Sequence, residues 1–184
     1  MQTRHAIRPL DPQVIGQIAA GEVVERPALA VKELVENSID AGATAVSVEI
    51  RDGGLSYFRV TDNGCGIVRG EIRMAFARHA TSKLRTAEEL RAIHTLGFRG
   101  EALASIAAVA HVELTTRAAQ EESGVKAVVR GGVIESIQDA PSPEGTSVTV
   151  RDLFFNTPAR RKFLKKPATE AGLVSDMMLR LILA

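Results

Sequence analysis

The feature that most limits the possible folds of this chain is a change from helix-forming to strand-forming sequence near residue 111. From there to residue 153, four short stretches are typical of strands and are joined by turns rich in glycine, proline and serine. The earlier half instead carries most of the helical patterns. This order predicts an α+β domain, a two-layer sandwich in which helices cover one face of a mixed, mostly antiparallel sheet. The four stretches are HVELTTRA, VKAVVRG, VIESIQDA and TSVTVRDLF.

The first half of the chain carries clear signals for the ends of helices. Asp11 and Pro12 are suited to begin a first helix, and a second helix is predicted from Pro27 until Gly42 stops it. The last segment is also helical, with a single apolar stripe that predicts packing on the core. The stripe consists of Leu173, Val174, Met177, Met178, Leu181 and Ile182. Two strands are also predicted, at 46–50 and 55–61. Three further helices are predicted, at 69–77, at 102–110 and as a short helix that begins at Thr86.

Composition excludes several classes of protein. A length of 184 residues with 45% hydrophobic and 24% charged residues predicts one globular domain, residues 1–184. A formal net charge of +1 indicates that contact with nucleic acid would need a local basic patch. The single cysteine, Cys65, excludes an internal disulfide and a cysteine-based zinc site. The N-terminus lacks the apolar region of a signal peptide, and no apolar run is long enough for a bilayer, so we expect a cytoplasmic protein without membrane contact.

Four polar residues of the second helix share one face. Glu33, Glu36, Asn37 and Asp40 lie at helical spacing, and the simplest interpretation is a solvated face, which is the one we adopt for Glu36 and Asp40. Glu33 and Asn37 are one turn apart, so both could reach one ligand. A carboxylate can orient and deprotonate water, and an amide oxygen can ligate Mg²⁺. The spacing permits this chemistry without requiring it.

Two glycine loops are further candidates. In the stretch 62–66, DNGCG, an ordinary tight turn is one interpretation, whereas the glycines would also let the backbone approach a flat ligand. In the stretch 97–101, GFRGE, glycines precede a helix whose first N–H groups could hold phosphate, although a hinge is the commoner role. Arg99 in that loop fits a phosphate clamp or a structural arginine equally well. Neither a P-loop nor a dinucleotide fingerprint occurs in the chain.

The order of these patterns resembles an ATPase superfamily that contains gyrase B, histidine kinases, Hsp-type chaperones and MutL. Its hallmarks are a helix with Glu and Asn, a D-x-G-x-G loop, a glycine-containing lid and a late Gly-Thr, here Gly145-Thr146. The resemblance narrows to the MutL family of DNA mismatch repair proteins and spans residues 15 to 166. The matching stretches are IAAGEVVERPALAVKELVENSIDAGA, DNGCGI, ARHATSK, LGFRGEALASI and DLFFNTPARRKFLK.

The resemblance implies a role for each matching residue. Glu33 would be the general base that activates water, and Asn37 the ligand to Mg²⁺. Asp62 would hold the amino group of adenine in ATP, with Gly64 and Gly66 in the same loop, Gly66 beneath the base and Thr146 supporting the contact. The lid around the phosphates would consist of Thr81, Ser82 and Lys83 together with Leu96, Gly97, Phe98, Arg99 and Gly100.

The resemblance also implies a function and partners. The expected function is Mg-dependent ATP binding and slow hydrolysis that acts as a switch in mismatch repair, with a MutS-type mismatch sensor as partner and a homodimer in the full-length protein. Relatives continue into a second, transducer domain and a dimerisation domain, so we expect this chain to be a fragment, monomeric and nearly inactive alone, from a protein that is nucleoid-associated during repair. Two alternatives remain, another ATPase of the superfamily (topoisomerase or chaperone) and a non-catalytic DNA-binding scaffold.

A local basic cluster is the candidate for DNA contact. Lysines and arginines gather near residue 160, where a solvated face is the simplest interpretation and a sequence-independent contact with phosphates is the alternative. The four histidines have no metal-site spacing, and nothing supports a nucleophilic or redox role for Cys65. The cluster consists of Arg160, Arg161, Lys162, Lys165 and Lys166.

Overall fold

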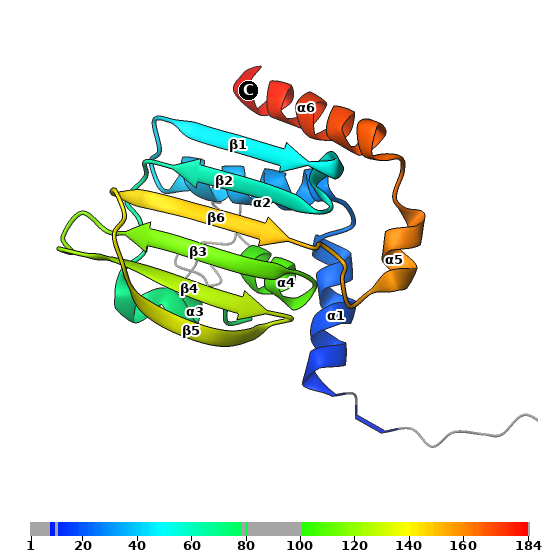
Figure 1. The fold of residues 1–184 in the computed structure, drawn as a ribbon, viewed down its shortest axis with the longest axis horizontal. Coiled ribbons are helices and arrows are strands. Elements are labelled where there is room, and N and C mark those ends of the chain that lie inside the picture. Colours follow the sequence, from blue (N-terminus) through cyan, green and yellow to red (C-terminus); the bar gives the residue numbers. More distant parts are fainter. Residues whose placement is uncertain (1–7, 10, 79, 81–100, 184) are drawn as a thin grey trace, which may run out of the picture.

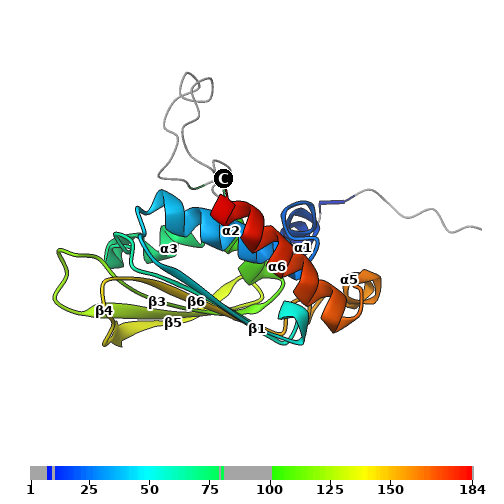
Figure 2. The same ribbon diagram turned by 90° about the horizontal axis from the view of Figure 1, so that it is seen from above.

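The computed structural model describes residues 8–9, 11–78, 80 and 101–183 of the chain. Within them six strands form one sheet in the order β1-β2-β6-β3-β4-β5, and every pairing is antiparallel (Figure 1). Helices lie over one face of this sheet (Figure 2). The expected two-layer α+β sandwich is confirmed, and the described sheet has no parallel pair.

The elements follow the sequence patterns closely. The helices are α1 (Pro12–Val23), α2 (Pro27–Asp40), α3 (Ile72–Ala75), α4 (Ala102–Ala108), α5 (Pro158–Phe163) and α6 (Pro167–Leu183), with 3₁₀ turns η1 (Asp52–Gly54) and η2 (Arg69–Glu71). The strands are β1 (Val46–Arg51), β2 (Tyr57–Asp62), β3 (His111–Arg117), β4 (Gly124–Arg130), β5 (Val133–Ala140) and β6 (Gly145–Arg151).

The core lies between the helices and the inner face of the sheet. Alternate residues of each strand point to this side, so that β3 buries Val112 and Leu114 while His111 and Glu113 remain partly exposed. Helix α2 contributes its own apolar face, including Leu34 and Val35. The two layers therefore bury one continuous apolar cluster, which fixes α2 above β1 and β2.

Helix α6 packs across the turn between β1 and β2. Glu170 is fully buried there, accepts a hydrogen bond from the backbone N–H of Lys165 at 2.9 Å, and lies 3.9 Å from Arg26 at the start of α2. A Cβ on Gly53, in η1, would lie 2.6 Å from the carbonyl oxygen of Pro167. Glycine at this position lets α6 approach the hairpin closely.

Two predicted elements differ from the structure. The helix expected over 69–77 is only the 3₁₀ turn η2 followed by the one-turn helix α3, which ends at Ala75. The apolar stripe of α6 packs on the core as expected except at its end, where Ile182 is 73% exposed and extends beyond the sheet. The helix predicted from Thr86 lies outside the described residues.

Among the described residues, no helix combines the length and the apolar character that crossing a bilayer requires.

Candidate functional site

Helix α2 presents two of its polar residues to a cavity beside the sheet. Glu33 and Asn37 are both half-buried and both line this cavity, as their spacing of one helical turn predicts. Away from the cavity, Val31 and Val35 of the same helix are buried in the core, and Leu34, which also lines the cavity, is buried as well. The apolar side fixes the helix on the sheet, and this attachment determines where Glu33 and Asn37 point.

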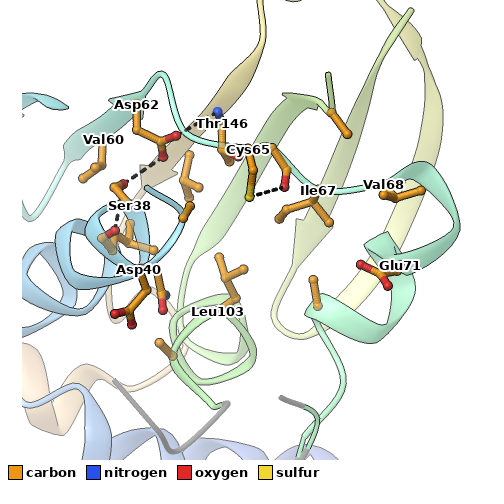
Figure 3. A pocket seen from close by; sticks show the side chains of 18 of the residues that line it. Ser38, Asp40, Val60, Asp62, Cys65, Ile67, Val68, Glu71, Leu103 and Thr146 are labelled. Atoms are coloured by element: carbon orange, nitrogen blue, oxygen red, sulfur yellow. Dashed lines mark hydrogen bonds between the residues drawn. The ribbon is translucent and has the colours of Figure 1, made fainter. Parts of the chain in front are cut away.

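The interpretation of Glu36 as solvent-facing is wrong. Glu36 is 5% exposed and is paired with Lys32, whose Nζ lies 2.6 Å from its Oε1 one turn earlier on α2. The helical spacing placed it near Glu33, but the packing of neighbouring elements covers that side of the helix. Asp40 also differs from the expectation, because it is half-buried and lines the cavity (Figure 3).

Asp62 at the end of β2 is held by three donors. Its Oδ2 accepts a hydrogen bond from the Ser38 hydroxyl at 2.8 Å, and its Oδ1 accepts one from the backbone N–H of Thr146 at 3.2 Å (Figure 3). Its Oδ1 also accepts from the backbone N–H of Gly64 at 2.9 Å. Ser38 comes from α2 and Thr146 from β6, so the carboxylate joins three elements. A carboxylate fixed in this way has lone pairs in defined directions and is suited to accept from one further donor.

Asn63 shapes the loop that follows. Its Oδ1 accepts from the backbone N–H groups of Thr44 and Ala45, both at 2.9 Å, and its Nδ2 donates to the Thr44 hydroxyl at 2.8 Å. These bonds attach the loop to the start of β1. The role of Asn63 is therefore structural, because both ends of its amide hold the backbone segment before β1.

Two glycines of the site are needed because the backbone is crowded. Gly66 has a φ of +69°, and a Cβ there would lie 2.2 Å from the carbonyl oxygen of Arg117. Gly145 has a φ of +112°, and a Cβ there would lie 2.1 Å from the carbonyl oxygen of Asp62. Both positions exclude other residues before any ligand is considered. Gly66 lines the cavity, whereas its expected place beneath an adenine ring stays a prediction.

Sequence reasoning missed two residues of this site. Ser38 fixes Asp62, and the buried Thr116 of β3 links three segments through one hydroxyl. The Thr116 Oγ1 accepts from the backbone N–H of Ile67 at 2.9 Å and donates to the carbonyl of Gly145 at 2.9 Å. The only sequence signal for Ser38 is its place between Asn37 and Asp40, and Thr116 has none, because its strand position looks like any other inward residue.

The cavity has a volume of about 880 Å³ and lies between α2, α3, α4 and the ends of β2 and β6. Its described lining contains four carboxylates and no lysine or arginine, so any polyphosphate bound here needs cations from elsewhere. Val60, Ile67 and Val148 form an apolar part of the wall. The acidic lining residues are Glu33, Asp40, Asp62 and Glu71, and the other lining residues include Asn37, Ser38, Cys65, Gly66, Leu103 and Thr146.

The lining suits a nucleotide with a divalent cation. An apolar wall beside a fixed carboxylate fits a flat base that carries an amino group, and the Asn37 amide oxygen with the Glu33 carboxylate offers the oxygen ligands that Mg²⁺ prefers. Within the described residues, no group of three or more histidine, cysteine, aspartate and glutamate side chains could hold a metal by itself. A cation here would share its coordination with phosphate oxygens and water, as Mg²⁺ usually does.

The residues expected to form the lid lie outside the described part of the chain. They are Thr81, Ser82, Lys83, Leu96, Gly97, Phe98, Arg99 and Gly100.

The basic cluster is less uniform than its sequence suggests. Arg161, Lys162, Lys165 and Lys166 are exposed, but Arg160 turns inward toward α1. Its guanidinium occupies the space that a side chain on Gly21 would fill, with Nη2 3.5 Å from the Ile18 carbonyl oxygen. Arg160 thus packs α5 against α1, and the exposed part of the cluster begins at Arg161.

Comparison with known proteins shows the family to which the chain belongs. The family described as "Histidine kinase-, DNA gyrase B-, and HSP90-like ATPase" matches residues 25–152, which include α2, the Asp62 loop and β6. The chain belongs to this ATPase family. The match contains every element that holds Asp62, and it confirms the superfamily resemblance.

Within the ATPase family, the chain is similar to MutL proteins. It is 55% identical over 175 residues to a DNA mismatch repair protein MutL of Agathobacter rectalis and 57% identical over 178 residues to one of Caldanaerobacter subterraneus. These alignments cover 95% and 97% of this chain, but only 27% and 30% of the relatives. The resemblance to the N-terminal ATPase domain of MutL is confirmed, and the chain spans less than a third of these relatives.

Solved structures agree with the sequence comparison. A MutL ATPase domain of Aquifex aeolicus, solved in complex with ADP, superimposes with a TM-score of 0.66 at 39% identity. The superposition covers 85% of this chain and 54% of that one. Another structure of the Aquifex domain gives a TM-score of 0.67 at 38% identity and covers 88% and 53%.

Proposed function

We propose that this ATPase domain binds ATP with Mg²⁺ in the cavity beside α2, hydrolyses it slowly, and serves as a nucleotide-controlled switch in DNA mismatch repair. The observation that carries the proposal is Asp62. Its carboxylate is held by Ser38, Gly64 and Thr146 at the wall of a cavity that Glu33 and Asn37 also line. The ADP complex of the similar Aquifex domain supports a nucleotide as the ligand.

The adenine base is assigned to the wall that contains Asp62. An ionised aspartate only accepts hydrogen bonds, so it favours the exocyclic amino group of adenine over the carbonyl oxygen of guanine. Thr146 and Ser38 keep the carboxylate in place, and Gly66 of the same loop also lines the cavity. Selection for adenine therefore rests on the direction of one carboxylate.

The phosphate end is assigned to Glu33 and Asn37. In the proposed reaction, Asn37 holds Mg²⁺ through its amide oxygen, and Glu33 orients a water molecule and accepts its proton. When bound, Mg²⁺ supplies positive charge to the phosphate oxygens, which an acidic cavity needs for phosphoryl transfer. Glu33 and Asn37 are one turn apart on a rigid helix, so the general base and the metal ligand keep a fixed separation.

The lid and the partners complete the proposal. Thr81, Ser82 and Lys83 with residues 96–100, including Arg99, are assigned to the lid over the phosphates. In the longer protein, ATP binding would favour pairing of two copies and contact with a MutS-type mismatch sensor and with DNA, and so couple mismatch recognition to strand processing. The names of the relatives support this role in repair. The cytoplasmic, nucleoid-associated location stays a prediction.

A competition experiment tests the proposal. We expect calorimetry to detect a non-hydrolysable ATP analogue with Mg²⁺, and the matching GTP analogue to bind more weakly by about tenfold or more, as for the loss of a hydrogen bond to a charged group. Equal binding of the two analogues would contradict the assignment of Asp62. Binding of neither would favour the scaffold alternative, while DNA relaxation or client protection would favour a topoisomerase or chaperone.

A further inference from the structure

A row of basic residues crosses the face of the sheet opposite the helices. On this face, residues that point away from the core lie directly opposite one another on neighbouring strands. At the end of the sheet where β6 leads into α5, five such residues form one continuous row. Arg51, Arg130 and Arg151 are exposed, and none of the described helices covers this face (Figure 2). In order across the sheet the row is Arg51, Tyr57, Arg151, His111 and Arg130.

Tyr57 holds two of these arginines in place. The guanidinium carbons of Arg51, on β1, and Arg151, on β6, each lie 5.1 Å from the centroid of the Tyr57 ring. Cation–π contacts of this kind restrict both side chains. Two like charges are therefore kept on either side of one ring, and a separate anionic group beside each arginine would stabilise this arrangement.

Neither of these two arginines forms an ion pair with a described carboxylate. Among the described residues, the neighbouring cations Arg59, Lys126 and Arg130 each have a carboxylate partner, and Arg117, at the other end of β3, donates to the backbone carbonyls of Ser142 and Glu121. Within that part of the chain, Arg51 and Arg151 have neither kind of partner. The hydrogen bond and the charge of Arg59 lower the pKa of Glu49, and Arg51 adds a smaller effect, so this carboxylate is already engaged by Arg59. The pairs are Arg59 with Glu49, Lys126 with Glu113 and Arg130 with Glu135, and the His111 ring nitrogen Nδ1 lies 3.4 Å from Asp152.

The spacing of the row suits a chain of anions rather than one small ion. Neighbouring strands lie about 4.8 Å apart, so Arg51, Arg151 and Arg130, each two strands from the next, recur at about 10 Å across the sheet. At the same end, Phe155 is 39% exposed, and its ring centroid is 4.4 Å from that of His111. Repeated cations beside an accessible aromatic ring are typical of surfaces that bind single-stranded nucleic acid.

We propose that Arg51 and Arg151, held by Tyr57, form a clamp for the phosphate backbone of single-stranded DNA on the open face of the sheet. The choice of DNA rests on the proposed role in mismatch repair, while the clamp itself rests on geometry and charge. This surface is separate from the α5 cluster and from the nucleotide cavity on the helical side.

Fluorescence anisotropy of a labelled oligothymidine of about 20 nucleotides tests the clamp with the 184-residue chain. The double variant Arg51→Gln/Arg151→Gln should bind at least about tenfold more weakly at low salt. Over a salt series from about 50 to 200 mM, its slope of log affinity against log salt should be shallower by about 1.4, the value for two lost phosphate contacts to a single strand. Tyr57→Leu, which keeps the charge, should weaken binding several-fold.

The matched control is Arg73→Gln/Arg180→Gln, which removes the same charge from exposed positions on the helical side. Equal affinity and slope in the two double variants would overturn the clamp, as would a parent chain that does not bind the oligonucleotide. Polyglutamate is a competitor that carries negative charge without being a nucleic acid. If it displaced the labelled oligothymidine from the parent as well as unlabelled oligothymidine does, and did not do so in Arg51→Gln/Arg151→Gln, DNA would be overturned as the occupant. Binding of the ATP analogue, measured on the same samples, should be unchanged in all variants and reports on the proposed function separately.

Discussion

Asp62 combines a structural and a recognition role in one side chain. It accepts from three donors on three segments, and it also lines the cavity where the base is assigned. A change at this residue should therefore affect both the local backbone and the affinity for nucleotide. The two effects can be measured separately. The stability of a variant without nucleotide reports on the backbone, and a titration with nucleotide reports on the affinity.

The substitution Asp62→Asn should weaken binding of the ATP analogue by about ten- to a hundredfold, the range for a hydrogen bond to a charged group. An asparagine presents an NH₂ group in place of one carboxylate oxygen. This NH₂ group is a donor, and it would face another donor, either the amino group of adenine or those of Ser38 and Gly64. Calorimetry checks the affinity. Asp176→Asn, at an exposed position on α6, is the control, and an unchanged affinity in Asp62→Asn would contradict the assignment.

Removing the amide of Asn37 should affect the metal rather than the fold. We expect Asn37→Ala to abolish the gain in analogue affinity that Mg²⁺ gives, with a melting temperature close to that of the parent, because Asn37 is half-buried at the cavity and outside the apolar core. Titrations with and without Mg²⁺ check this. A variant that keeps the full Mg²⁺ effect would remove Asn37 from the metal site.

At the scale of elements, the site depends on how closely β2 and β6 approach. Asp62 pairs with Thr146 across the two strands, and Gly145 lets the chain turn against the Asp62 backbone. The same segment receives the Thr116 hydroxyl from β3. Small changes in backbone position here should be transmitted directly to the Asp62 carboxylate.

Gly145→Ala should lower the free energy of unfolding by about 2 kcal/mol or more, since the added Cβ meets the Asp62 carbonyl and the positive φ is strained. Analogue affinity should fall as well, because Asp62 must shift. Urea denaturation and calorimetry check both effects. Gly70→Ala, where a Cβ would meet nothing within 4 Å, is the control and should change neither quantity appreciably.

The attachment of α6 gives a second prediction at this scale. Glu170→Gln should destabilise the chain by about 1–3 kcal/mol, the usual cost of disturbing a buried hydrogen-bonded charge. The reason is that a fully buried carboxylate accepts from Lys165 and lies near Arg26 at the start of α2. Thermal unfolding checks it against the exposed Thr169→Ala. Equal stability of the two variants would show that apolar contacts of α6 are sufficient.

Sequence patterns predicted the elements better than their contacts. The strand that begins at His111 and the helix that begins at Pro27 depend on local sequence patterns, and both were confirmed. Glu36 was misjudged because its burial depends on neighbours that are distant in sequence. Ser38 and Thr116 were missed for the same reason, since their hydrogen-bond partners lie 24 or more residues away. The proposed roles of Glu33, Asn37 and Asp62 came from family resemblance rather than from spacing alone.

At the scale of the whole molecule, the described cavity is acidic and has no cationic side chain. We expect the 184-residue chain to hydrolyse ATP very slowly, because charge neutralisation at the phosphates is the main requirement of phosphoryl transfer. Glu33→Gln should change this low rate little and should preserve binding, whereas in a longer protein it should stop hydrolysis. A phosphate-release assay checks both. Brisk turnover that depends on Glu33 would show that the chain supplies all the necessary charge.

The place of β6 in the sheet has a consequence for biosynthesis. Among the six described strands β6 is the last in sequence, yet it lies between β2 and β3, where it pairs with both (Figure 1). While a ribosome is still making residues 145–151, the hairpin β1-β2 and the meander β3-β4-β5 each expose an edge with unpaired N–H and C=O groups. Such edges can pair with other chains. Until β6 is made, these two edges stay open to pairing with other chains, and only afterwards do Asp62 and Thr146 meet.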